Sequence, residues 1–274
     1  MNKRLLVAEL VVACTVMVCC GRVMNYDDPL EPGFAGNFSD VRPDFDGTIK
    51  VVSYNIGFGE NVERAIHELT EFDDLRSADI ILLQEMDEVG TQAIAQALRY
   101  EFVYYPASVH SYHSKNFGNA ILSKWPISDS EKILLPHVNP RNKQRRIAVK
   151  AVINIADLKV LTYSVHTETF WLGRRKRDGQ IAFLVNSIDG SYRHAVVGGD
   201  FNTVTPKSIR ELEDRFDRMG MERASKGSGC TVAYPFFGFT LDHIFTKGMS
   251  VSRSGTSGES EASDHVPIWV EIVP

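Results

Sequence analysis

Cysteine is scarce in this chain, and its placement excludes a disulfide-stapled fold. The 274 residues include four cysteines, of which Cys14, Cys19 and Cys20 lie near the N-terminus. Cys230 is the only one in the remaining sequence, so no disulfide framework is available there. The domain must therefore be held together by an apolar core, for which 43% of hydrophobic residues is an ordinary supply.

Positive charge is also in short supply, because the formal net charge is −5. This excludes the basic balance of a dedicated, tight nucleic-acid binder. A polyanionic substrate would need a local basic patch or a bound cation. The sequence has no internal repeat and no low-complexity tract, which excludes a repeat array. Beyond the first forty or so residues, roughly 230 remain, enough for one large α/β domain.

The N-terminus carries a targeting signal. Two basic residues precede residues 5–20, which are apolar apart from Glu9 and a threonine. A basic start before a short apolar run predicts a signal peptide, because the run is short for a membrane span. The residues before Cys14 resemble the lipobox of bacterial lipoproteins, in which the cysteine is lipidated, and Cys19 or Cys20 offers a looser match. An uncleaved membrane anchor is the alternative.

The segment after this signal has the composition of a linker. Residues 21–48 carry Pro, Gly, Asp and Asn with little periodicity, which predicts a tether. We therefore predict a signal peptide over residues 1–20, a tether over 21–48 and a catalytic domain over 49–274. With either reading of the N-terminus the domain is exported, and we expect a bacterial protein, membrane-anchored, extracellular or periplasmic, and monomeric.

The domain alternates short apolar runs with amphipathic segments, which predicts an α/β fold. Helices are predicted where apolar residues recur every three or four positions, at residues 62–69, 91–98, 177–188 and 206–216. Strands are predicted at the apolar runs 49–54, 80–83, 102–105, 119–122, 127–134, 146–152, 158–164, 195–197, 241–245 and 266–270. The pattern therefore has many strands and few helices.

One stretch organises the rest of the sequence. Gly198 and Gly199 follow an apolar run, and these glycines let the backbone approach a ligand closely or turn sharply. Asp200 and Asn202 come next, and in an extended chain their side chains point the same way. The carboxylate can accept a proton from water or hold a cation, and the amide can donate to a phosphate oxygen. The alternative is a glycine-rich turn with local side-chain hydrogen bonds.

Other strands also end in polar side chains. Strand interiors and their flanks are poor places for unpaired charge, so a whole series of such ends calls for an explanation. Open α/β sheets place their ligands at the carboxyl ends of strands. We therefore predict that these residues form one site. They are Asn55, Glu85, His166, Asp200 with Asn202, Asp242, and Asp264 with His265.

These blocks, in this order, resemble the endonuclease/exonuclease/phosphatase superfamily. The resemblance covers residues 49–273 and rests on Ser-Tyr-Asn at 53–55, Leu-Gln-Glu at 83–85, Gly-Asp-Phe-Asn at 199–202 and Ser-Asp-His at 263–265. It implies a DNase I-like, four-layer α/β sandwich, with two mixed β-sheets packed face to face and helices outside. The superfamily includes nucleases, inositol-polyphosphate 5-phosphatases and sphingomyelinases.

The resemblance also implies catalytic roles. Asp200 is expected to orient or deprotonate the attacking water. Asn202 and His166 are expected to donate hydrogen bonds to the phosphate oxygens. His265 is expected to contact the scissile phosphate, and Asp242 to orient that imidazole and raise its pKa.

A divalent metal is implied by the same resemblance. Glu85 is expected to be the principal ligand of a Mg²⁺ or Mn²⁺ ion, with Asn55 beside it. Hard cations keep oxygen ligands and several waters, so one or two carboxylates suffice. Asp264 is expected to support a second metal position.

Two features bear on the substrate. Basic residues cluster at 141–146 and at 174–177, where they could hold the flanking phosphates of a nucleic acid or be ordinary solvated charges. Aromatic residues at 170–171 and 234–239 could stack on bases, dip into a lipid surface or pack in the core. We expect four substrate-binding residues: Asn119, Arg146, Arg174 and Phe239.

The sequence thus predicts a divalent-metal-dependent phosphodiesterase in which a water molecule attacks the phosphorus atom in line. The leading substrate is nucleic acid. A membrane-lipid phosphodiesterase of the sphingomyelinase type is the runner-up. A catalytically silent surface-binding protein on the same fold is the other alternative, although the complete polar set argues against it.

Overall fold

The computed structural model describes residues 23–40, 43–110, 113–234 and 237–274. Within these residues, one mixed sheet has eight strands in the order β1-β5-β6-β4-β3-β16-β15, with β2 also paired to β5. Its strands are β1 (Met24–Asn25), β2 (Phe34–Asn37), β3 (Ile49–Asn55), β4 (Ile80–Met86), β5 (Glu101–Val109), β6 (Asn116–Ser123), β15 (Ser250–Thr256) and β16 (Ile268–Val273).

A second mixed sheet of the described chain has six strands in the order β11-β14-β10-β9-β8-β7. Its strands are β7 (Ile127–Val138), β8 (Arg145–Ile155), β9 (Leu158–His166), β10 (His194–Asp200), β11 (Glu222–Arg223) and β14 (Asp242–Lys247). A separate hairpin pairs β12 (Val232–Tyr234) with β13 (Phe237–Phe239).

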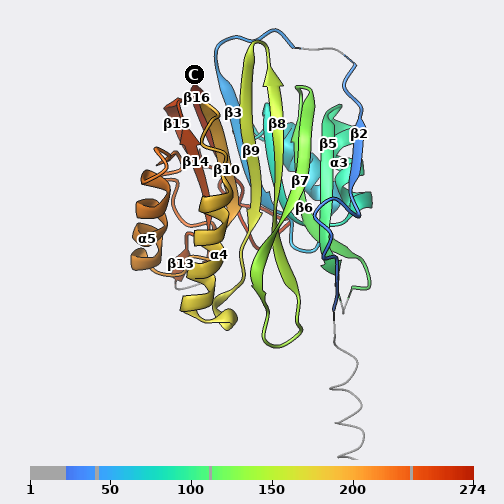
Figure 1. Ribbon diagram of the computed structural model, residues 1–274. Helices are drawn as coiled ribbons and strands as arrows, with labels where there is room; N and C mark the ends of the chain where they lie inside the picture. The colour runs from blue at the N-terminus through green and yellow to red at the C-terminus, as the bar shows by residue number, and fades with distance from the viewer. Residues whose placement is uncertain (1–22, 41–42, 111–112, 235–236) are drawn as a thin grey trace, which may run out of the picture.

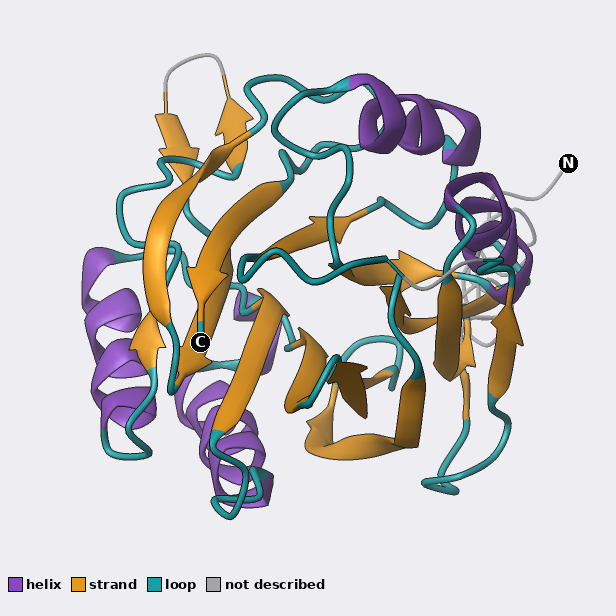
Figure 2. Ribbon diagram, turned by 90° about the horizontal axis from the view of Figure 1, so that it is seen from above, coloured by secondary structure: helices purple, strands orange, loops and turns teal. Residues whose placement is uncertain are grey.

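Helices cover the outer face of each sheet, as Figures 1 and 2 show. Helices α2 (Val62–Glu71) and α3 (Glu88–Leu98) pack on the first sheet, and α4 (Arg174–Ser187) and α5 (Pro206–Asp217) pack on the second. Local sequence sets where α5 begins, since Thr205 caps it in a reciprocal pair with Ser208 and Pro206 follows at the first position. A short 3-10 turn, η1 (Phe170–Leu172), precedes α4.

The described residues form three apolar clusters in the core, which explains why the strands are almost continuously hydrophobic. In β4, Ile80 and Leu82 point into the cluster between the two sheets. Ile81 and Leu83 point the other way, into the cluster beneath α2 and α3. A strand with both faces buried needs apolar residues at every position. The arrangement is the predicted four-layer α/β sandwich.

The two glycines of the organising stretch do not form a turn. Both lie inside β10, with Gly199 at a φ of 145°. A Cβ atom on Gly199 would lie 1.9 Å from the carbonyl oxygen of Val165 in β9, and one on Gly198 would lie 2.7 Å from a methyl of Leu82 in the other sheet. The turn expectation is therefore wrong. These glycines let β10 lie close to its own neighbours within the protein.

The described residues include part of the predicted tether but not the predicted signal peptide. The predicted signal over residues 1–20 lies outside the described residues. Part of the range 21–48 is attached to the domain, because β1 and β2 both pair with β5. None of the helices in the described ranges is long and apolar enough to cross a membrane.

Candidate active site

Strand register brings the predicted site residues to one edge of the sandwich. In the second sheet, Asp200 at the end of β10 lies opposite His166 of β9 on one side and Asp242 of β14 on the other. In the first sheet, β3 and β4 run parallel, so that Asn55 lies opposite the residue before Glu85. Because parallel neighbouring strands end at the same edge, side chains from distant parts of the sequence meet there.

Asp200 is the centre of this cluster. Its side chain is buried, and one carboxylate oxygen accepts from the amide of Asn55 at 3.3 Å. The same oxygen lies 3.4 Å from Nε2 of His166 and 3.9 Å from Nε2 of His265. Burial and the nearby Asp242 carboxylate raise the pKa of Asp200 above its usual range. A carboxylate in such surroundings can accept a proton near neutral pH.

Arg146 fixes the tautomer of His166. A guanidinium nitrogen of Arg146 lies 3.1 Å from Nδ1 of His166, and a guanidinium can only donate. Nδ1 therefore accepts, and the imidazole proton is on Nε2, the nitrogen that faces Asp200. Burial and the positive charge of Arg146 hold the pKa of His166 well below its usual range, so the ring is neutral.

His265, unlike His166, is held in its protonated, positively charged state. Its Nδ1 lies 2.8 Å from a carboxylate oxygen of Asp242. Burial alone lowers the pKa of His265, but the carboxylates of Asp242, Asp200 and Asp264 outweigh burial and raise it to about 10. The site thus places a neutral imidazole and an imidazolium on two sides of the Asp200 carboxylate.

Glu85 owes its position to a break in the sheet. The pairing of β4 with β6 shifts register between Leu83 and Met86, and Glu85 adopts a left-handed φ of 59°. Such a conformation is strained for a residue with a side chain and often marks a functional position. The carboxylate lies 3.7 Å from Nε2 of His166 with 13% of the side chain exposed. Burial raises its pKa, although Arg146 and His265 oppose that shift.

The oxygen donors around Glu85 fit an open divalent-metal site. Asn55 contacts Glu85, and Asp264 lies within electrostatic range of it. Within the described residues, no group of three or more His, Cys, Asp or Glu side chains could by itself hold a metal ion. Mg²⁺ commonly keeps several waters and binds through one or two carboxylates, which is the chemistry this set can supply. Glu85, Asp200, Asp242 and Asp264 also concentrate negative charge that a cation would neutralise.

Asn202 follows the end of β10, and its conformation differs from the extended one that was predicted. Its φ is 50°, so the chain is not extended here and the two side chains are not aligned by strand geometry. The side-chain amide donates to the carbonyl of Thr167 at 3.0 Å, and the backbone N–H donates to Asp200 at 2.8 Å. The latter is the local side-chain hydrogen bond that the alternative interpretation expected.

The four expected substrate-binding residues lie in different places. Arg146 is buried at the centre, against His166. The amide of Asn119 donates to the carbonyls of two strands in the facing sheet, so it joins the sheets. Arg174 lies on α4 and pairs with Asp178 and Glu211, and Phe239 is partly buried in β13. Thus Arg146 alone of the four bonds directly to the Asp200 cluster in the described contacts.

Sequence reasoning missed several supporting residues. Glu168 lies 3.6 Å from the Arg146 guanidinium, and its place two residues after His166 could have suggested this. Thr231 accepts hydrogen bonds from the backbone N–H groups of Leu241 and Asp242, which fixes the start of β14. No local pattern marks that threonine, because its partners lie ten residues further along the chain.

A family model shows the class of protein, whose members hydrolyse phosphoester bonds. The chain belongs to the Endonuclease/Exonuclease/phosphatase family, whose model matches residues 52–265. Among solved structures, it is similar to a family protein from Bacteroides thetaiotaomicron, with a TM-score of 0.66 and 20% identity over 82% of this chain and 97% of that one. A mannosyl-6-phosphatase from the same organism gives a TM-score of 0.63 and 18% identity over 82% and 100%. Identities this low show the fold alone.

A relative found by sequence comparison matches a smaller part of this chain. A UPF0294 protein of Vibrio vulnificus is 26% identical over 113 residues, which is 41% of this chain. The match spans only 39% of that protein's length. The family and the fold are therefore shown, and the substrate has to be argued from this chain's own residues.

Proposed function

We propose that this protein is a divalent-metal-dependent phosphodiesterase that cleaves nucleic acid. The observation that carries the proposal is the surroundings of Asp200. Its buried carboxylate lies within 3.9 Å of nitrogen atoms from Asn55, His166 and His265, which come from both sheets and from the loop before β16. Such a preorganised set suits a reaction that moves a proton from water while negative charge grows on phosphate oxygens.

Each side chain has a task in this proposal. Asp200 accepts the proton of the attacking water, because burial and Asp242 have raised its pKa. The Nε2–H of His166, fixed by Arg146, is free to donate to a phosphate oxygen once substrate is bound. His265, kept charged by Asp242, stabilises the negative charge of the phosphoryl group. To Asn202, whose amide donates one hydrogen bond to the carbonyl of Thr167, we assign a further one to the phosphate.

Glu85 and Asn55 would hold the divalent cation, with Asp264 in support. When bound, the ion supplies positive charge that polarises the phosphoryl group. The remaining work is that of the chain itself, which orients the phosphate and the attacking water at Asp200.

Nucleic acid is the substrate that the surface around the site favours. Several basic side chains lie on nearby segments, and the guanidinium of Arg141 stacks 3.4 Å from the ring centroid of Trp171. Phe170 and Trp171 are about half exposed, at 57% and 48%. Cations with exposed aromatic rings can hold phosphates and stack on bases. We further propose that the protein acts outside the cytoplasm, because residues 1–20 have the pattern of a signal peptide.

The test is hydrolysis by the full chain with Mg²⁺ or Mn²⁺. Plasmid DNA, RNA, sphingomyelin vesicles and a sugar phosphate monoester are offered side by side. We expect metal-dependent cleavage of DNA or RNA that falls by several orders of magnitude in Glu85→Ala and Asp200→Ala and persists in the control Glu63→Ala, an exposed acid of α2. Turnover of vesicles or the monoester alone would refute the nucleic-acid substrate, and an active Asp200→Ala enzyme would refute the mechanism.

A further inference from the structure

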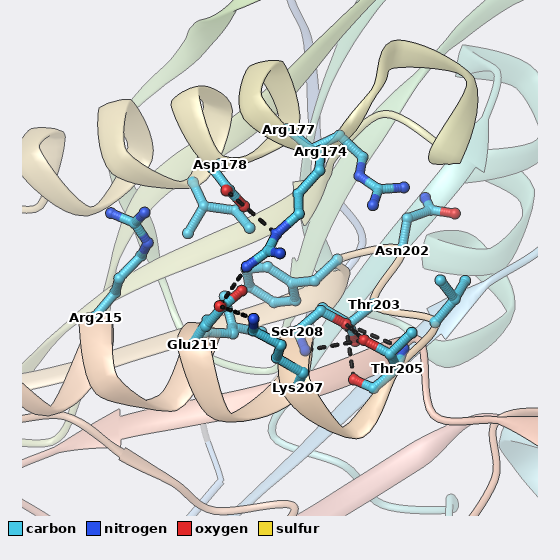
Figure 3. A pocket seen from close by; sticks show the side chains of 14 residues that line it. Arg174, Arg177, Asp178, Asn202, Thr203, Thr205, Lys207, Ser208, Glu211 and Arg215 are labelled. Carbon is cyan, nitrogen blue, oxygen red and sulfur yellow. Dashed lines mark hydrogen bonds and ion pairs between the residues drawn. The ribbon is translucent and has the colours of Figure 1, made fainter.

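A cavity of about 370 Å³ lies between α4 and α5, beside the candidate active site. Its wall includes the segment that follows Asp200, from Phe201 to Thr205. Asn202 belongs both to this wall and to the proposed catalytic set. Figure 3 shows the two helices on either side of the cavity, with Asn202 at one end and Arg215 at the other. A group bound here would therefore lie next to a phosphate held at Asp200.

Among the charged residues that line the cavity, basic ones outnumber acidic ones. Four basic side chains face it, against two acidic ones, Asp178 and Glu211. The basic residues are Arg174, Arg177, Lys207 and Arg215. Below them the wall is apolar, with Leu212 and Phe201 both about 1% exposed. A wall that excludes water strengthens the attraction between these cations and an anion.

The acids do not satisfy all of the cations. Arg174 bonds to Glu211 and lies 3.9 Å from Asp178, and Lys207 lies 4.0 Å from Glu211. Arg177 is different, because its Nη1 atom is buried and has no hydrogen-bond partner among the described residues. In Figure 3 its guanidinium points toward the end of the cavity where Asn202 lies.

An unpartnered buried guanidinium nitrogen destabilises the folded protein. A buried donor without an acceptor has lost its hydrogen bonds to water and gained none in return, and the loss is larger for a charged group. Burial, together with the positive charge of Arg174, also lowers the pKa of Arg177 despite the neighbouring Asp178. The backbone N–H groups at the start of α5 do not supply the missing acceptor, because they are donors themselves. Because Nη1 itself has almost no accessible surface, an anion in the cavity would contact the part of Arg177 that lines it, with the unpartnered nitrogen beside it.

We propose that the cavity between α4 and α5 binds a second phosphate group of the substrate, adjacent to the scissile one, with Arg177 as its main contact. The assignment of that phosphate to a substrate rests on the proposed function. A guanidinium presents its donors in a fixed fork that matches phosphate oxygens. Lys207 and Arg215 provide further charge on the opposite wall. The site therefore selects substrates with phosphates in series over isolated phosphodiesters.

The first test compares dinucleotides with and without a terminal phosphate, placed at either end. We expect the wild-type KM to be about tenfold or more lower for one phosphorylated dinucleotide, as one charge-assisted hydrogen bond implies. Arg177→Gln should abolish that KM ratio. Arg175→Gln, an exposed neighbour on the same helix that does not line the cavity, should keep it. A wild-type ratio of one at both ends, or an intact ratio in Arg177→Gln, would overturn the proposal.

The second test separates the cavity from catalysis. Binding of inorganic pyrophosphate to the full chain is measured by calorimetry in EDTA, so that no metal contributes. Wild type and Arg175→Gln should bind alike, and Arg177→Gln should bind at least about tenfold more weakly. Equal binding by all three would overturn the cavity assignment even if the enzyme is an active nuclease. If neither DNA nor RNA is hydrolysed, the proposed function fails while this measurement still decides the cavity. If Arg177→Gln does not fold, Arg215→Gln serves in its place.

Discussion

Acid should destabilise this protein through one buried histidine, His243. This residue of β14 is fully buried. Its Nε2 lies 2.7 Å from the hydroxyl of Thr203, and its Nδ1 lies 3.5 Å from the guanidinium of Arg223. Because Arg223 can only donate, Nδ1 accepts and the ring is neutral, with its proton on the nitrogen that faces Thr203.

The size of the effect follows from the pKa of His243. Burial, reinforced by Arg223, lowers it from 6.5 to about 3. Below pH 6.5, His243 is therefore protonated in the unfolded chain but stays neutral in the folded chain. The stability contributed by this group is complete above pH 6.5 and is lost as the pH falls toward 3. The loss is about 1.4 kcal/mol per pH unit, or about 2 kcal/mol by pH 5.

The assay is urea unfolding of wild type and His243→Gln between pH 8 and pH 4.5. Glutamine can still present an N–H toward Thr203, yet it does not titrate. We expect the stability advantage of the wild type over the variant to shrink by about 2 kcal/mol between pH 7.5 and 5. His67→Gln, at an exposed position of α2, should leave the wild-type pH dependence unchanged. An advantage of His243 that stays constant over this range would refute the reasoning.

Two further predictions concern the candidate site. Arg146→Gln should lower kcat about 10- to 100-fold, because His166 loses the donor that fixes its tautomer, and nitrogen NMR should then show the Nδ1–H form gaining population; unchanged tautomer and rate would exclude this role. Mg²⁺ at about 100 times its Kd should stabilise the wild type by about 2.7 kcal/mol in thermal unfolding, and should not stabilise Glu85→Gln. An equal shift in both proteins would place the metal away from Glu85.

The sequence alone predicted the fold class and most of the cluster around Asp200. Both faces of the central strands are buried, so their apolar runs are unbroken and easy to recognise, as at Ile80 to Leu83. Polar residues that end such runs must share an edge of the sheet. That argument brought Asn55, Glu85, His166 and Asp200 together before any distance was known, and the register of β9 and β10 agrees with it. Their catalytic roles stay predictions.

Packing between elements decided where two of the expected substrate-binding residues lie, and the sequence did not predict those positions. Asn119 ends up joining two sheets, because its amide bonds to carbonyls of β8 and β9. Arg174 bonds to α5 and lines a cavity, since α4 and α5 pack side by side on the second sheet. Helical periodicity identifies the buried face of each helix, but it does not say which basic residue faces the neighbouring helix.

Sequence determined what each strand buries and which side chains gather where the strands end, because those features are set by local alternation of apolar and polar residues. Tertiary structure decided the chemistry of the individual groups. Arg146 and Asp242 give two histidines different protonation states, one neutral and one charged, only because they touch them, across 3.1 Å and 2.8 Å. The Nη1 atom of Arg177 is buried without a hydrogen-bond partner among the described residues because of how the elements around it pack. Burial and contact fix protonation and hydrogen bonding, and both arise when distant segments pack together.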